Sequence, residues 1–221
     1  MLEVLPRAST SPALIETGDG RRWVMKFTGA GPGPFGVLTE YLALGIARRL
    51  AAPVPEAWPV LLPEGFPWMA GTDEFDAMLQ RSWGWNLAVA FVPDARPAEP
   101  ADLAPSPALA AIALADRFLQ NMDRTARNPN LLVAADGIVA IDYDACLYLS
   151  RALGPPRPPA TAQPPGHLLA GLPLPEPSAP PPLDMRALVD PAPPAWLDAA
   201  GVDRETLAAQ LAASYAAWAA A

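Results

Sequence analysis

Short apolar runs separated by turn residues fill residues 1–92, a pattern typical of antiparallel strands. Gly18-Asp19-Gly20 lies between two of these runs and is a strong signal for a hairpin turn. After a loop rich in glycine and proline, apolar residues recur at the spacing of one packed helix face. The pattern predicts a helix over residues 35–50 and five strands, over residues 2–5, 13–16, 22–27, 57–62 and 86–92, with a loop that contains a short helix between the last two strands.

The composition changes beyond the fifth predicted strand. Residues 93–107 are rich in proline and indicate a linker between two lobes. A strongly apolar stretch then predicts a helix over residues 108–121, and two apolar strands are expected over 131–134 and 138–141. We therefore expect an N-lobe at residues 1–92 and a C-lobe at residues 108–221.

The last part of the chain begins with a proline-rich segment, residues 155–194, which holds fifteen of the thirty prolines. Such a composition predicts a surface segment with little regular structure. A final helix is expected after Asp203, a good N-cap residue. Four apolar residues at helical spacing predict the face that packs on the core: Leu207, Leu211, Tyr215 and Trp218.

Composition excludes several classes of protein. The net charge of −8 argues against non-specific binding to nucleic acid or to an anionic membrane. One cysteine, Cys146, cannot form an internal disulfide and is expected in packing, and one cysteine with one histidine cannot build a zinc site. The N-terminus lacks a signal-peptide pattern, and no apolar run reaches the roughly 20 residues that span a bilayer. We expect a soluble, cytoplasmic protein without nucleic acid or membrane as a partner.

Lys26 is the single lysine among fifteen basic residues. The other fourteen are arginines, which fits a coding bias, so an ammonium group retained at one position is a candidate functional residue. Lysine differs from arginine wherever a compact point charge is needed.

The densest polar stretch is Asn121–Asn130, which follows the apolar helix. It contains Asp123 and Asn128, and Asp142 comes fourteen residues after Asn128 at the end of a predicted strand. A strand–turn–strand would bring these side chains to one edge. Carboxylate and amide oxygens are hard ligands of the kind that a Mg²⁺–phosphate complex takes, so the sequence predicts a phosphate-handling site here.

The same order of residues occurs in kinase-like phosphotransferases, where Asp-x4-Asn precedes a metal-binding aspartate. A lysine on the third strand and a glutamate on the next helix, here Lys26 and Glu40, match the ion pair that holds the ATP phosphates in such folds.

Over about residues 1–150 the chain resembles the HipA-like kinase family, and in particular its short, single-domain members. The motifs around Asn121 and Ile141 are also similar to those of phosphatidylinositol kinases. The resemblance rests on these segments: Val24-Met-Lys26-Phe, Thr39-Glu40-Tyr-Leu-Ala, Pro53-Val-Pro55, Phe118-Leu-Gln-Asn121-Met-Asp123-Arg124-Thr-Ala-Arg-Asn128-Pro-Asn130-Leu-Leu and Ile141-Asp142-Tyr.

The resemblance implies an α+β, bilobal protein-kinase-like fold with a small antiparallel-sheet N-lobe and a mainly helical C-lobe. It implies that ATP and Mg²⁺ are the cofactors and that the acceptor is a Ser/Thr hydroxyl of a protein. Asp123 would orient or deprotonate the attacking hydroxyl, and Asn128 and Asp142 would hold Mg²⁺. Lys26, steadied by Glu40, would contact the phosphates.

Two further assignments rest on position in the resembling fold. The turn Ser9-Thr10-Ser11 would cover the phosphates with backbone N–H groups. The strand Ala90-Phe91-Val92 would line the adenine pocket.

Other polar residues near these motifs leave choices open. Asp144 is either a second metal ligand or, as we expect, a loop cap. Arg124 and Arg127 either bind a phosphate or fix the loop that contains Asp123. His167, in the proline-rich segment, is expected to be an exposed residue without a role.

The chain has no His-Arg-Asp, Asp-Phe-Gly or Ala-Pro-Glu motif, so it is not a eukaryotic-type protein kinase. Two alternatives to a protein kinase stay open: a pseudokinase that binds without turnover, and a kinase that acts on a small alcohol or a lipid headgroup. The proline-rich segment is expected to shape the acceptor side of the site.

Overall fold

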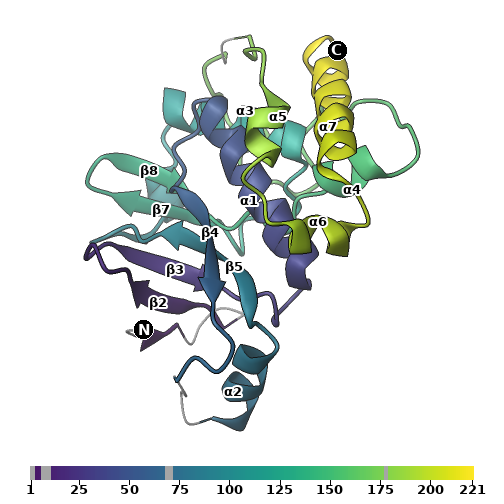
Figure 1. The fold of residues 1–221 in the computed structure, drawn as a ribbon. Helices are drawn as coiled ribbons and strands as arrows, with labels where there is room; N and C mark the ends of the chain where they lie inside the picture. Colours follow the sequence, from purple (N-terminus) through teal and green to yellow (C-terminus); the bar gives the residue numbers. More distant parts are fainter. Residues whose placement is uncertain (1–2, 6–10, 68–71, 177–178) are drawn as a thin grey trace.

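The computed structural model describes residues 3–5, 11–67, 72–176 and 179–221. These residues form an N-lobe built on an antiparallel sheet and a C-lobe built mainly of helices (Figure 1). The α+β architecture that the sequence predicts, with an antiparallel-sheet N-lobe and a mainly helical C-lobe, is therefore confirmed.

The N-lobe sheet has five antiparallel strands in the order β1-β2-β3-β5-β4. The 17-residue helix α1 connects β3 to β4, and a short helix α2 connects β4 to β5. The elements are β1 (Glu3–Val4), β2 (Ala13–Glu16), β3 (Arg22–Lys26), α1 (Gly33–Arg49), β4 (Ala57–Leu62), α2 (Asp73–Gln80) and β5 (Gly84–Ala90). All five predicted strands are present, and β5 begins and ends two residues before the predicted 86–92.

The register of β3 determines which side chains reach the interior between the lobes. Successive side chains of a strand point to opposite faces, so Trp23 and Met25 lie on one face and Lys26 on the other. Met25 and Phe27 pack with residues of α2, including Phe75 and Met78. Lys26, paired with Leu87 of β5, therefore faces α1 and the C-lobe.

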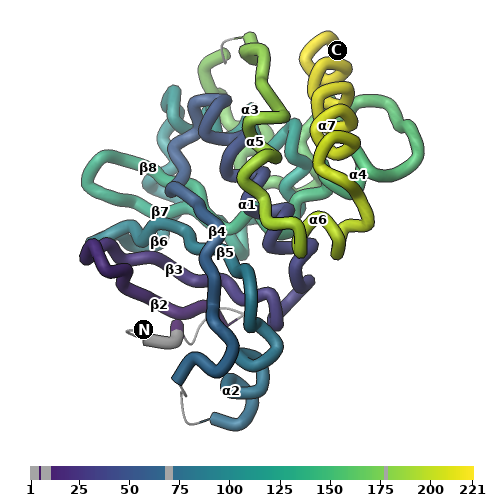
Figure 2. The backbone as a smooth tube through the Cα atoms, in the orientation of Figure 1, coloured from purple at the N-terminus to yellow at the C-terminus, as the bar shows by residue number. Residues whose placement is uncertain are grey.

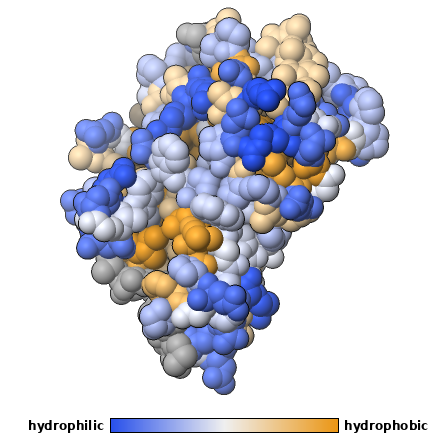
Figure 3. Space-filling view, in the orientation of Figure 1, coloured by the Kyte–Doolittle hydropathy of each residue, from blue (hydrophilic) through white to orange (hydrophobic). Residues whose placement is uncertain are grey.

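The outer face of the sheet carries apolar side chains, which appear as an orange patch over β3 and β4 in Figure 3. Trp23, Trp58 and Val60 line an open groove of about 270 Å³ on this face. The guanidinium of Arg21 lies 5.1 Å from the ring centroid of Trp23 and covers one end of the patch.

The C-lobe combines a small sheet with a group of helices (Figure 2). Helix α3 begins after Ser106, whose side chain accepts a hydrogen bond from the Leu109 N–H, and the last helix begins after Asp203, which caps Thr206 in the same way. The elements are β6 (Arg96–Pro97), the 3₁₀ turn η1 (Pro100–Asp102), α3 (Pro107–Leu119), β7 (Leu131–Ala134), β8 (Gly137–Ala140), α4 (Tyr148–Leu153), α5 (Met185–Val189), α6 (Pro194–Ala200) and α7 (Arg204–Ala219).

The predicted linker, residues 93–107, has structure of its own. Its strand β6 pairs with β7, which belongs to the second sheet, in the order β6-β7-β8. Arg96 also holds Asp102 through two hydrogen bonds of 2.6 and 2.7 Å. The linker between the lobes stays a prediction, and two of its residues, Arg96 and Pro97, form an edge strand too short to leave a periodic pattern in the sequence.

One hydrophobic core joins the two lobes. Helix α1 contributes Leu42 and Ile46, which are fully buried, and α3 contributes Leu109 and Ile112 to the same cluster. The Tyr148 hydroxyl donates a 2.9 Å hydrogen bond to the Thr39 carbonyl, which ties α4 to α1. Helix α1 thus lies between the N-lobe sheet and the helices of the C-lobe, as Figure 1 shows.

The C-terminal stripe packs on this core as predicted. Its four members, Leu207, Leu211, Tyr215 and Trp218, are buried. The rings of Tyr215 and Trp218 lie 5.1 and 5.2 Å from that of Phe118 on α3.

The proline-rich segment holds the short helix α5 and the beginning of α6. Gly45 of α1 faces α5, where an added Cβ would come within 2.6 Å of Leu188 Cδ2, so a larger residue at this position would displace the Leu188 side chain. No helix in the described part of the chain has the length and apolar character needed to cross a membrane.

A matched pair of leucine substitutions tests the core. Leu42 is fully buried in the core shared by the lobes, whereas Leu61 on the edge strand β4 is 53% exposed. We expect Leu42→Ala to lower the free energy of unfolding by about 2–5 kcal/mol, and Leu61→Ala to change it by less than about 1 kcal/mol. Urea denaturation measures both, and equal losses would contradict the assignment of α1 to the core.

Candidate active site

Lys26 lies between two carboxylates that come from different parts of the fold. Its Nζ is 2.7 Å from Glu40 Oε1 and 2.6 Å from Glu40 Oε2 on α1. The same nitrogen is 2.5 Å from Asp142 Oδ1, in the loop after β8. Three residues singled out in the sequence are thus brought together, although 116 positions separate Lys26 from Asp142.

Each partner is fixed by its own element. Glu40 is 1% exposed, in the part of α1 that the core holds, whereas the Asp142 side chain is 37% exposed. Asp142 has a φ of +61°, a left-handed conformation that aspartate tolerates better than most residues and that turns the chain directly after β8. The loop between β3 and α1 closes over the pair and, with Lys26, Glu40 and Asp144, encloses a small cavity of about 20 Å³.

The surroundings shift the protonation of this group. Burial lowers the pKa of Lys26, but the attraction of Glu40 and Asp142 outweighs it, so that the pKa of Lys26 is raised and the ammonium is kept. Burial raises the pKa of Glu40 to about 7, with Lys26 opposing the rise. Burial, and then the charge of Asp142, raise the pKa of Asp144.

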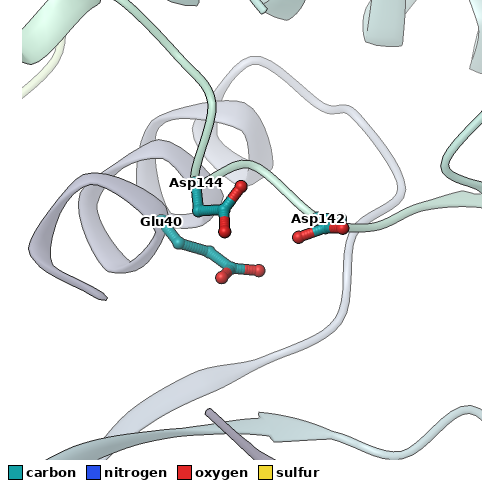
Figure 4. Close-up of side chains that lie close together, drawn as sticks. All are labelled: Glu40, Asp142 and Asp144. Carbon is teal, nitrogen blue, oxygen red and sulfur yellow. The ribbon is translucent and has the colours of Figure 1, made fainter. Parts of the chain in front are cut away.

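Figure 4 shows that Glu40, Asp142 and Asp144 point toward one another. One carboxylate oxygen from each residue lies within 4.8 Å of the other two. Carboxylate oxygens are the hard donors that Mg²⁺ takes, and in this cluster Lys26 Nζ lies between those of Glu40 and Asp142. Asp144, for which we expected a loop cap, has its carboxylate in this acidic cluster and also interacts with the backbone of Ala145.

Asp123 lies in the loop that follows α3. Its Oδ2 accepts hydrogen bonds from Asn128 Nδ2 at 2.6 Å and from Asn130 Nδ2 at 3.1 Å. Its backbone N–H donates to Asn121 Oδ1 at 3.1 Å. The structure thus brings Asn128 to Asp123, while Asp142 lies with Lys26. The negative charge of Asp123 contributes to the raised pKa of Asp144, so the loop and the acidic cluster act on each other electrostatically.

A buried polar group lies beneath this loop. Arg124 Nε is 2.5 Å from Asp116 Oδ2, and Arg124 Nη1 donates to the Pro129 and Asn130 carbonyls at 3.1 and 2.6 Å. Both charged side chains are fully buried. Arg124 therefore fixes the loop, whereas Arg127, the other arginine considered for that role, is exposed.

The expectation that His167 is exposed is wrong. His167 is 5% exposed, and its Nε2 lies 3.1 Å from Asp116 Oδ2. The proline-rich segment folds back against the loop, with the Leu168 N–H donating to the Arg124 carbonyl at 2.8 Å. No local sequence pattern predicts that the proline-rich segment contacts a loop some forty residues earlier in the chain.

Sequence reasoning also missed Asp116. The signal was present, because a carboxylate inside the strongly apolar stretch 108–121 requires a buried cationic partner. Arg124, eight residues further along the chain, is that partner.

The other predicted site residues remain predictions. Ser9 and Thr10 lie outside the described residues, and Ser11 has a φ of +45° just before β2. Ala90 ends β5 opposite Trp23, and the guanidinium of Arg22 lies 4.9 Å from the ring centroid of Phe91. Val92 follows in the chain segment that leads out of the N-lobe.

Comparison with known proteins gives one distant structural similarity. No protein-family model and no curated protein matches the chain. Among solved structures, the crystal structure of a Helicobacter pylori proinflammatory kinase, CtkA, is similar, with 18% sequence identity and a TM-score of 0.39 over 66% of this chain. The match covers 59% of that kinase. Membership of the HipA-like family stays a prediction.

The raised pKa of Glu40 predicts a specific pH dependence of stability. Its value of about 7, against an ordinary 4.5, means that the carboxyl takes up a proton on folding between these pH values. Its contribution to stability is fully present below pH 4.5 and is lost as the pH rises through 7. We expect the unfolding free energy of the wild type, relative to Glu40→Gln, to fall between pH 5 and pH 8.

Urea denaturation of both proteins at several pH values measures this difference. Titratable groups that do not interact with Glu40 cancel in the comparison. A difference that stays constant, or that grows with pH, would contradict the burial of an ionisable Glu40.

Proposed function

We propose that this protein is an ATP- and Mg²⁺-dependent phosphotransferase of the HipA-like kinase type, which transfers the terminal phosphoryl group of ATP to a Ser/Thr hydroxyl of a protein. One observation carries the proposal: the Lys26 ammonium bridges Glu40 on α1 and Asp142 in the loop after β8. Such an arrangement holds a positive charge at the junction of the two lobes, where phosphates would need it.

The phosphate- and metal-binding part of the nucleotide side is assigned to Lys26, Glu40, Asp142 and Asn128, with Asp144 as a further ligand. Lys26 would contact the phosphates while Glu40 holds its ammonium in place. Asp142 and Asn128 would hold the metal, and the acidic cluster offers Asp144 as a further oxygen ligand. Mg²⁺, when bound with ATP, would neutralise charge on the transferred phosphoryl group.

The acceptor side is assigned to Asp123. In phosphoryl transfer the acceptor oxygen forms a bond to the terminal phosphorus while the bond from that phosphorus to ADP breaks. The proton of the acceptor hydroxyl would pass to the Asp123 carboxylate. Asn128 and Asn130 both donate to Oδ2, which orients the carboxylate, and we assign Oδ1 to the acceptor hydroxyl.

Thermal unfolding with and without Mg²⁺-ATP tests the nucleotide site. Binding to the folded state alone should add about 2.7 kcal/mol at a hundredfold excess over the dissociation constant. We expect this shift to need Mg²⁺ and to be lost or strongly reduced in Asp142→Asn. Asp136→Asn, at an exposed turn between β7 and β8, is the matched control and should keep the shift. A wild type that shows no shift with millimolar Mg²⁺-ATP would overturn the nucleotide site.

A second variant separates transfer from binding. We expect Asp123→Ala to lower phosphoryl transfer from radiolabelled ATP to Ser/Thr-containing proteins by about 10²–10⁴-fold, because the proton acceptor is removed. The Mg²⁺-ATP thermal shift should stay close to that of the wild type. Loss of both properties would contradict the assignment of Asp123 to the acceptor side, and binding without transfer in the wild type would identify a nucleotide-binding pseudokinase instead.

A further inference from the structure

A fully buried polar group connects the proline-rich segment to the loop that contains Asp123. Asp116 on α3 is its centre, with Arg124 Nε at 2.5 Å and His167 Nε2 at 3.1 Å from the same carboxylate oxygen, Oδ2. All three side chains are buried, and they come from three separate segments of the chain.

The hydrogen bonds of His167 assign its protonation. The Leu169 N–H donates to Nδ1 at 3.2 Å, so Nδ1 carries no proton. Nε2 must then be the protonated nitrogen, and it donates to Asp116 Oδ2. The ring is neutral, and the charges of Asp116 and Arg124 balance each other. Burial raises the pKa of Asp116, but attraction to Arg124 and the hydrogen bonds with His167 and Arg124 together outweigh it, so that the pKa is lowered and this acceptor stays ionised.

The same group determines the path of the loop. Arg124 lies near the start of the loop, and its guanidinium donates to the carbonyls of Pro129 and Asn130 at the end of the loop. The two ends of the loop are thus held together. Thr125 pairs with His167 in an antiparallel bridge, and the Leu168 N–H donates to the Arg124 carbonyl. Asp123 directly precedes Arg124, and Asn130 donates to Asp123.

We propose that His167 is a positioning residue for Asp123, and that it acts through its Nε2–H bond to Asp116. This bond fixes the Asp116 carboxylate against Arg124, and Arg124 fixes the loop on which Asp123 and Asn128 lie. The proline-rich segment is then part of the scaffold of the site and not only a surface cover. The role of His167 in catalysis rests on the phosphotransferase function proposed above. Its role in ordering the loop that contains Asp123 does not depend on that function.

Two substitutions of similar size isolate the hydrogen bond. His167→Gln keeps an N–H donor at about the distance of Nε2, whereas His167→Met has similar length and no donor. We expect His167→Met to increase hydrogen exchange at least tenfold in the peptide that covers residues 122–130. We also expect it to lower kcat at least tenfold, with KM for ATP within about twofold of the wild type. His167→Gln should stay within about threefold of the wild type in both kcat and exchange.

A general loss of packing would give a different result. Leu168→Ala removes half-buried apolar atoms from the same segment and leaves the donor in place, so it should behave like the wild type in exchange of residues 122–130. Equal effects of His167→Met and His167→Gln, or no effect of His167→Met, would overturn the proposal. If His167→Met does not fold, His167→Asn replaces it, because its shorter amide cannot reach Asp116.

The exchange measurement also separates this inference from the proposed function. If the wild type transfers no phosphate, the phosphotransferase proposal fails, and the difference in exchange between His167→Met and His167→Gln still decides the role of His167. If transfer occurs and the two variants do not differ, the function stands and the positioning role is wrong.

Discussion

The ion pair between Lys26 and Glu40 is the interaction on which the arrangement of the site depends. A buried Glu40 needs the ammonium, because an unpaired carboxylate in the core would cost several kcal/mol or take up a proton. Lys26 in turn is held where it also reaches Asp142, so β3, α1 and the loop after β8 are fixed relative to one another. Three carboxylates surround one ammonium, and burial, together with the negative charge of the neighbouring carboxylates, raises the pKa of Glu40 and of Asp144. The site is therefore electrostatically prepared for a further cation.

Much of the fold could be predicted from the sequence because its signals are local. The spacing of nearby apolar residues predicts the strands of the N-lobe, the helix α1 and the C-terminal stripe. The pairing of Lys26 with Glu40 could also be predicted, since a lysine on the third strand and a glutamate on the next helix match the ion pair of kinase-like folds. The order of motifs along the chain singled out Asp123 and Asp142 as candidate site residues. It did not indicate that Asp142 contacts Lys26 while Asn128 contacts Asp123.

The remainder depends on how distant segments return to one another. The role of His167 follows from the path of a proline-rich segment, and such a segment has no periodicity from which a path could be derived. Strand β6 is only two residues long, too short to leave a pattern. Asp116 is the exception, because a carboxylate in an apolar helix predicts a buried cation, and only the identity of that cation needed the structure.

Two separate polar groups thus determine the geometry of the site. One, around Lys26, joins the lobes on the side assigned to the nucleotide, and the other, around Asp116, lies under the loop assigned to the acceptor. Neither shares a residue with the other, so each can be perturbed while the other stays formed. Their link is electrostatic and passes through Asp144, whose pKa responds to Asp142 on one side and to Asp123 on the other. A cation held by Asp142 and Asp144 would therefore act on both sides at once, lowering the repulsion that Asp123 experiences as well as neutralising the acidic cluster.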